Sequence, residues 1–316
     1  MNLNPLSAVY GAVVGARNAL YDRRLLRPRS LQGPVISVGN ISTGGSGKTP
    51  FVILLGELLK ARGIRFGVLS RGYGRATRGV LLVDPGGLPR DFGDEPLLIA
   101  RRLRAPVVVG EDRYEAGRFA ESRFGAQIHV LDDGFQHRAL ARDFDIVLVT
   151  PEDARDRLLP AGRLREPLRS LRRADAVVLA SGASAESFPL TGKTVWRVRR
   201  GIVAQNVPAR PVAFCGIARP QNFLLQLRAA GVDPIAEAFF RDHHSYTEKD
   251  VRDLLQLRER SEAGGFVTTE KDAVNLGGYL DALAPLAVVP VKMELADAAN
   301  AVDAMLRTIA ERRGRS

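Results

Sequence analysis

Residues 42–49 read STGGSGKT and lie between an apolar run at 35–38 and a helix-like stretch at 50–62. A strand, a glycine-rich turn, Gly-Lys-Thr and then a helix are typical of a phosphate-binding P-loop. The strict pattern G-x-x-x-x-G-K-[ST] is not met, because Ser42 stands where the first glycine is expected. The alternative is a glycine-rich turn that contains Gly-Lys-Thr by coincidence. We favour a nucleotide site.

Each residue type in this loop has a physical task. Glycines let the backbone turn its N–H groups inward around phosphate oxygens. Lys48 can reach the terminal phosphates, and the hydroxyl of Thr49 is placed to bind Mg²⁺. The helix that follows presents its positive end to the anion. The predicted phosphate-binding residues are Ser42, Thr43, Gly44, Gly45, Ser46, Gly47, Lys48 and Thr49.

Apolar runs alternate with helical patterns along the first two thirds of the chain. The runs are rich in Val, Ile and Leu without strict alternation, as buried parallel strands are. We predict an α/β fold of the P-loop NTPase type, a mostly parallel sheet flanked by helices, with a second, smaller α/β domain. Strands are expected at 35–38, 66–70, 107–110, 128–131, 145–149, 176–180, 194–198, 212–215, 265–268 and 288–291, and helices at 50–62, 111–124, 222–230 and 247–258.

Three segments are expected. Residues 1–30 form an N-terminal amphipathic, membrane-associating segment, 31–200 the P-loop domain, and 201–316 the smaller C-terminal domain. The last helix is a candidate to return to the first domain. The boundary near residue 200 follows a stretch rich in Gly, Ser and Pro, where the pattern loosens.

Composition excludes several classes of protein. The single Cys215 cannot form an intramolecular disulfide, and no run of 18 apolar residues is long enough to span a bilayer as a helix. The net charge of +11 suits phosphate ligands, nucleic acid or an anionic membrane. No zinc-finger spacing, RNA-binding signature or basic zipper is present, so nucleic acid is not an expected partner.

The first 30 residues place apolar side chains at helical spacing and arginines after them. Leu6, Val9 and Val13 belong to the apolar stripe, and Arg23 and Arg24 to the basic end. Such a helix suits the interface of an anionic membrane. The alternative is a helix packed on its own domain with exposed arginines, and these residues alone do not separate the two.

Asp132 and Asp133 end the apolar run at 128–131. In P-loop proteins such a strand lies beside the loop, and its last Asp holds Mg²⁺ or its water shell. Two acids after an apolar run can also be a turn. After a P-loop, the metal interpretation is favoured. In extended backbone the two side chains would point to opposite faces of the sheet.

Asp94 and His243 are weaker candidates when judged locally. Asp94 and Glu95 precede Pro96, a pattern typical of the start of a helix, although a kinase also needs a carboxylate to accept a hydroxyl proton. His243 follows Asp242 and could assist a base, but on local evidence a surface loop is the favoured explanation.

Together these motifs resemble the tetraacyldisaccharide 4′-kinase family, the lipid A 4′-kinases of Gram-negative bacteria. The match runs in order over nearly the whole chain. Its motifs are VGNI at 38–41, GGSGKTP at 44–50, SRGYG at 70–74, GDEP at 93–96, DDGFQH at 132–137, LPAG at 159–162, Arg165-Glu166, DHH at 242–244 and TTEKD at 268–272. The resemblance implies that serine at the first P-loop position is typical of this family, so Ser42 does not count against nucleotide binding.

The resemblance implies transfer of the γ-phosphoryl group of ATP, with Mg²⁺, to the 4′-hydroxyl of a tetraacylated glucosamine disaccharide 1-phosphate, giving lipid IV-A. It implies that Asp94 accepts the hydroxyl proton with His243 as its partner in a catalytic dyad. It further implies a metal-side acidic shell of Asp132, Asp133 and Glu166, beside Thr49. The resemblance also implies a peripheral protein on the anionic lipid surface of the inner membrane, at its cytoplasmic face. No obligate protein partner is inferred.

A P-loop GTPase or ATPase switch acting on a protein partner is the competing interpretation. It would be favoured by a guanine-specificity motif such as Asn-Lys-x-Asp, which the sequence lacks.

Overall fold

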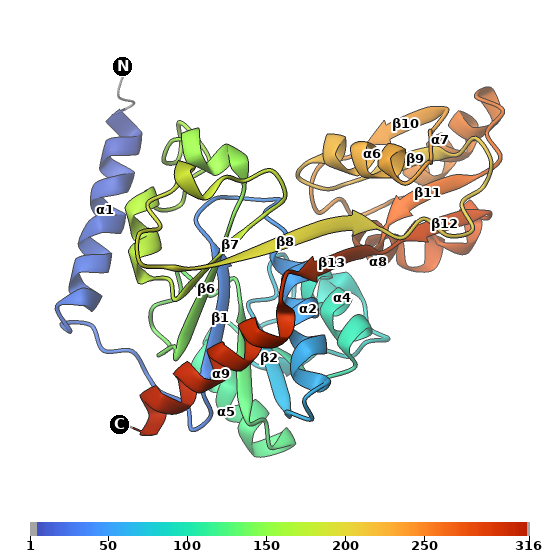
Figure 1. Ribbon diagram of the computed structural model, residues 1–316. Helices are drawn as coiled ribbons and strands as arrows, with labels where there is room; N and C mark the ends of the chain where they lie inside the picture. Colours follow the sequence, from blue (N-terminus) through green and yellow to red (C-terminus); the bar gives the residue numbers. More distant parts are fainter. Residues whose placement is uncertain (1–4, 315–316) are drawn as a thin grey trace.

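The computed structural model describes residues 5–314. Its larger sheet has nine strands (Figure 1). In spatial order they are β13 (Val291–Leu295), β8 (Thr194–Ile202), β7 (Ala176–Leu179), β6 (Phe144–Val149), β1 (Val35–Asn40), β5 (Ile128–Asp132), β2 (Phe66–Ser70), β4 (Val107–Val109) and β3 (Leu81–Leu82). Only the two edge strands, β13 and β3, pair antiparallel to their neighbours. The prediction of a mostly parallel α/β sheet is confirmed.

Helices cover both faces of this sheet, which explains why its central strands lack polar alternation. On one face, Ile36 and Val38 of β1 pack with Phe51 of α2 (Lys48–Lys60). The same cluster includes residues of α4 (Asp94–Leu103) and α9 (Ala298–Gly314). On the other face, Val35 packs with Ala116 of α5 (Arg113–Phe124). A short helix, α3 (Pro89–Phe92), precedes α4.

The smaller sheet has four parallel strands in the order β10 (Ala236–Phe239), β9 (Val212–Cys215), β11 (Phe266–Thr269) and β12 (Leu286–Val289). Its helices are α6 (Pro220–Ala229), α7 (Glu248–Arg260) and α8 (Glu270–Leu276). Short 3-10 turns complete the chain at Pro151–Arg155, Leu168–Arg173, Ala185–Ser187, Gly277–Tyr279 and Asp281–Leu283.

The chain leaves the larger sheet at the end of β8 and returns to it with β13 and α9 (Figure 1). The return therefore starts one strand earlier than the last helix. The single strand expected at 288–291 is wrong, because β12 ends at Val289 in the smaller sheet and β13 begins at Val291 in the larger one. Pro290 lies between them and has no N–H to extend a ladder.

Helix α1 (Pro5–Asp22) runs along the side of the larger domain (Figure 1). The predicted N-terminal segment begins at residue 1, so its first four residues lie outside the described part of the chain. None of the α1 residues is buried, and Leu6, Val9 and Val13 are 64%, 62% and 63% exposed. Within residues 5–314, no helix is both long and apolar enough to cross a bilayer.

Candidate active site

The P-loop lies between β1 and α2, at the carboxyl edge of the larger sheet, where parallel α/β sheets bind ligands. Gly44, Gly45 and Gly47 have φ angles of 66°, 65° and 85°. This left-handed region favours glycine, so a side chain at any of them would strain the turn. Gly47 is also the N-cap of α2, and no side chain caps the helix there. Its first N–H groups therefore face the loop, ready for an anion.

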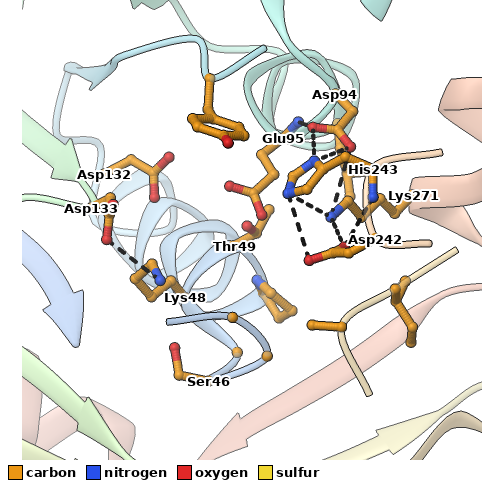
Figure 2. A pocket seen from close by; sticks show the side chains of 18 of the residues that line it. Ser46, Lys48, Thr49, Asp94, Glu95, Asp132, Asp133, Asp242, His243 and Lys271 are labelled. Atoms are coloured by element: carbon orange, nitrogen blue, oxygen red, sulfur yellow. Dashed lines mark hydrogen bonds and ion pairs between the residues drawn. The ribbon is translucent and has the colours of Figure 1, made fainter. Parts of the chain in front are cut away.

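Polar contacts within the protein support the loop. Asn40, the last residue of β1, donates from Nδ2 to the Ser46 Oγ at 2.8 Å. Its Oδ1 accepts a hydrogen bond from the Lys48 Nζ at 3.1 Å. Lys48 also lies 3.4 Å from the Asp133 Oδ1 (Figure 2). The ammonium group is thus held over the loop by one amide and one carboxylate.

Asp132 is brought beside the loop by strand pairing, because Val38 of β1 is its partner in register. Its side chain is 2% exposed, and the Ser70 Oγ donates to its Oδ2 at 3.0 Å. Burial, followed by the charges of Glu95 and Asp133, raises the pKa of Asp132 to about 7. A cation bound beside this carboxyl would favour its ionised form, so the position suits a metal ion.

Asp133 lies in a different backbone conformation, with a φ of 51°. The strand has already ended at Asp132, so the opposed orientation expected for an extended pair does not apply. Both residues line the same cavity. Burial opposes ionisation of Asp133, but Lys48 and Arg165 outweigh it and hold its pKa below the ordinary value. The Arg165 guanidinium donates to both carboxylate oxygens, at 2.8 and 3.0 Å.

The donor set here fits Mg²⁺. Thr49, in the first turn of α2, and both aspartates line the cavity. Among the described residues, none donates a hydrogen bond to the buried Oδ1 of Asp132. Within 5–314, no group of three or more His, Cys, Asp or Glu side chains could hold a metal by itself. An ion would therefore need nucleotide phosphate and water oxygens as well, as Mg²⁺ in nucleotide sites does.

Glu166 is not among the described residues that line this cavity. Its carboxylate is 2% exposed and accepts from the Arg173 guanidinium at 2.9 and 3.0 Å. The Asn18 Nδ2 of α1 donates to its Oε2 at 2.7 Å. Burial opposes its ionisation, yet the Arg173 hydrogen bond and charge keep its pKa below the ordinary value. Of the predicted metal-side residues, the structure brings together Thr49, Asp132 and Asp133.

The structure joins Asp94 and His243, which are 149 residues apart. Asp94 opens α4 and is 6% exposed, while His243 lies in the loop after β10. The His243 Nδ1 lies 2.8 Å from the Asp94 Oδ2 and 3.0 Å from Oδ1 (Figure 2). The local interpretations, a helix start and a surface loop, describe where the residues sit but miss this contact.

The two groups change each other's proton affinity. Burial opposes ionisation of Asp94, but the His243 hydrogen bond and the Lys271 charge hold its pKa below the ordinary value. The hydrogen bond to Asp94 raises the pKa of His243, against burial and the positive charge of Lys271. Asp94 is therefore an ionised carboxylate at neutral pH, with an oriented imidazole beside it.

Lys271 and Asn275 of α8 complete this cluster and were missed by sequence reasoning. The Lys271 Nζ lies 3.2 Å from the His243 Nε2 and 2.9 Å from the Asp242 Oδ1, and the Asn275 Nδ2 donates to Asp94 at 3.2 Å. The Thr269 side chain caps the start of α8 by accepting a hydrogen bond from the Asp272 N–H. Because helix capping explained this stretch locally, Lys271 was not predicted as a site residue. The available signal was its place in the TTEKD motif of the family resemblance.

One cavity of about 700 Å³ contains both the P-loop and the Asp94–His243 pair. It lies between the two sheets, since residues of both domains line it. Its lining includes the guanidinium-bearing residues Arg17, Arg71, Arg113, Arg165, Arg200 and Arg219. A large cavity with this charge and with one carboxylate base suits anionic phosphate compounds.

Comparisons with known proteins agree with this arrangement. The family model described as tetraacyldisaccharide-1-P 4′-kinase matches residues 1–310. The tetraacyldisaccharide 4′-kinase of Koribacter versatilis is 51% identical over 99% of this chain and all of its own length, and that of Chlorobaculum tepidum is 43% identical over 85% of each. A crystal structure of LpxK from Aquifex aeolicus in complex with ATP has a TM-score of 0.79 and 36% identity, covering 96% of this chain and 97% of that one. The chain belongs to the tetraacyldisaccharide 4′-kinase family.

Proposed function

We propose that this protein transfers the γ-phosphoryl group of ATP to the 4′-hydroxyl of a tetraacyldisaccharide 1-phosphate, giving lipid IV-A. It is a kinase of lipid A biosynthesis that uses ATP and Mg²⁺. The observation that carries the proposal is the single cavity that contains a phosphate-binding loop and a carboxylate–histidine pair. A switch protein needs the loop but has no use for the pair, so the GTPase or ATPase alternative is not favoured.

The donor phosphates would be held by residues 42–49. Backbone N–H groups around the three glycines surround an anion, and Lys48 neutralises charge that grows in the transition state. Thr49, Asp132 and Asp133 would hold Mg²⁺, which supplies charge neutralisation at the phosphates when bound. Binding of the ion would also give the unpaired Asp132 Oδ1 a partner.

The acceptor would be activated at Asp94. Phosphoryl transfer depends mainly on alignment and charge neutralisation, and it also requires a correctly placed base that accepts the hydroxyl proton. Asp94 meets this requirement because His243, Lys271 and Asn275 keep it ionised and fix its orientation. The His243 ring also lies near the Tyr73 ring, with ring centroids 5.6 Å apart. We assign His243 to the positioning of the Asp94 carboxylate.

The enzyme would work at the surface of an anionic membrane, as a peripheral protein on the cytoplasmic face of the inner membrane, without an obligate protein partner. An acceptor with four acyl chains stays in the lipid phase, so the catalytic cavity must reach that surface. The apolar stripe of α1 supports this, because Leu6, Val9 and Val13 point away from the protein and the helix ends near Arg23, Arg24 and Arg27.

The test follows radiolabelled γ-phosphate in the presence of Mg²⁺, with and without a tetraacyldisaccharide 1-phosphate in detergent micelles. We expect label to move to the lipid, and release of free phosphate without acceptor to be slow. If ATP is hydrolysed equally fast with and without the lipid, and no labelled lipid forms, the kinase assignment fails. GTP in place of ATP separates a GTPase switch from both.

A further inference from the structure

The segment 158–166 forms one wall of the P-loop. The Thr43 N–H donates to the Arg163 carbonyl at 2.8 Å, and the Arg165 N–H donates to the Ile41 carbonyl at 2.7 Å. The Arg163 guanidinium donates to the carbonyls of Thr43 at 2.7 Å and Gly44 at 3.1 Å. Ser42 and Leu164 are paired as an isolated antiparallel bridge. The loop's backbone shape therefore depends on this segment.

The same segment also controls a charged side chain of the site. Arg165 holds Asp133 through both carboxylate oxygens, and Asp133 in turn lies 3.4 Å from the Lys48 ammonium. A shift of Arg165 would leave Asp133 with Lys48 as its nearest cation and would draw the lysine toward it. The position of residue 165 thus affects how much positive charge is free for the nucleotide.

Helix α1 also makes hydrogen bonds to the segment 158–166. The Tyr10 hydroxyl donates to the Arg165 carbonyl at 3.0 Å, and the Asn18 Nδ2 donates to the Glu166 carboxylate at 2.7 Å. Near its start, the Ser7 hydroxyl donates to the Leu158 carbonyl at 3.0 Å. Because α1 has no buried residue, these polar contacts, and not an apolar core, fix the helix to the segment.

We propose that Tyr10 and Asn18 are positioning residues for the nucleotide site: α1 holds residues 165 and 166, and these hold the P-loop and Asp133. One helix would then serve two surfaces, with its apolar stripe toward lipid and its polar side toward the ATP site. The inference about lipid rests on the proposed function, whereas the effect on nucleotide binding does not.

The decisive variant is Asn18→Ala, compared with Asn300→Ala. Both remove one amide that donates to a carboxylate, since the Asn300 Nδ2 donates to Asp297 at 2.9 Å, and Asn300 does not line the cavity. Alanine favours the helix, so α1 itself should persist. We expect Asn18→Ala to raise the Kd and KM for ATP about ten-fold, as loss of a hydrogen bond to a charged group does. Asn300→Ala should change neither.

Nucleotide binding is measured on the full chain without acceptor, with a fluorescent ATP analogue, so the result stands whether or not the lipid is the true acceptor. Vesicle co-sedimentation and the KM for the lipid should stay at the wild-type value. Equal ATP affinity in Asn18→Ala and Asn300→Ala would overturn the proposal, and so would a change confined to membrane association. In either case the kinase assignment would be untouched, because it depends on transfer by the wild-type protein.

Two further variants guard against a trivial loss of fold. Asn18→Asp places a carboxylate against the buried Glu166, so it should weaken ATP binding more than alanine does. Tyr10→Phe removes only a hydroxyl and should weaken ATP binding by a smaller factor. Wild-type ATP affinity in both variants, with unchanged thermal unfolding, would contradict the proposal.

Discussion

The two ends of the catalytic cavity are built in opposite ways. The phosphate end lies within one domain, where residues 42–49 supply the loop and the segment 158–166 supports its backbone. The acceptor end is assembled from α4 of the larger domain and from the loop after β10 and α8 of the smaller one; Figure 2 shows their side chains Asp94, His243 and Lys271 together. A local site keeps its shape when the domains shift, whereas an assembled one exists only while they are in contact. Changes at the two ends should therefore have different kinetic signatures.

Asp94→Asn should give the largest loss. It keeps the size of the side chain but removes the base, and we expect kcat to fall about 10³- to 10⁴-fold. ATP affinity should stay near the wild-type value, because the Asp94 carboxylate is held by His243 and Lys271 (Figure 2) and by Asn275, and these lie outside the loop at 42–49. Single-turnover transfer and equilibrium ATP binding check this. If Asp94→Asn lost its affinity for ATP, Asp94 would have a role in nucleotide binding and not only in activation of the acceptor.

Lys48→Met should come next, with the reverse signature. Removing the cation leaves Asp133 paired with Arg165 only and takes away stabilisation of the transferred phosphoryl group. We expect kcat/KM for ATP to fall about 10²- to 10³-fold, with ATP binding weakened as well. The KM for the lipid acceptor is the internal control and should not change. If Lys48→Met weakened only the binding of the lipid acceptor, the assignment of Lys48 to the phosphate end would be wrong.

His243→Gln should have an intermediate effect on rate and a distinct effect on pH dependence. In the wild type, the His243 hydrogen bond and charge help to hold the pKa of Asp94 below its ordinary value. Without them burial is less opposed, so the pKa of Asp94 rises and the acid limb of the pH profile moves to higher pH. At neutral pH we expect a loss of about 10- to 100-fold, the effect of one charge-assisted hydrogen bond.

The check is the pH dependence of kcat/KM in both proteins, with Lys271 and Asn275 unchanged. Asp94 must be ionised to accept a proton, so activity is lost as the pH falls through its pKa. If the acid limb of His243→Gln coincides with that of the wild type, His243 does not act through Asp94.

Val13→Asp on α1 should have the smallest effect on the chemistry. The side chain is 63% exposed and points away from the polar contacts of the helix. We expect vesicle binding to weaken about ten-fold, because a buried valine contributes roughly 1.5–3 kcal/mol. Transfer to acceptor in detergent should stay at the wild-type rate. If Val13→Asp co-sedimented with anionic vesicles as the wild type does, the apolar stripe of α1 would not contribute to membrane binding.

Much of the fold could be predicted because its central strands are buried on both faces and so read as apolar runs. The strands predicted at 66–70 and 212–215 have those bounds in the structure. The edge strands β3 and β10 were missed, since they are short and half exposed. The break at Pro290 was missed because Val288–Val291 is apolar throughout apart from the proline, and pattern alone does not say which sheet a strand joins.

The predictability of the site residues likewise depends on whether a local pattern encodes them. The motif at 42–49 predicted a phosphate site, because a few φ angles and one helix start make one, but it did not predict the support from the segment 158–166. The residue pattern around Asp94 and His243 gave each an ordinary local explanation, and only the family resemblance joined them. The placement of Glu166 on Arg173, and of Lys271 on His243, had no local signal at all.

By itself, then, the sequence determined the class of fold, the P-loop and the family, because these depend on periodicity, on glycine's backbone freedom and on an ordered set of motifs. Only the tertiary structure decided that Asp94 meets His243 and Lys271, that Glu166 is bound by Arg173 and Asn18, and that the apolar stripe of α1 faces away from the protein. The physical reason is distance along the chain. A contact between residues 94 and 243 has no period or local preference to reveal it, and forms only when the two sheets are packed together.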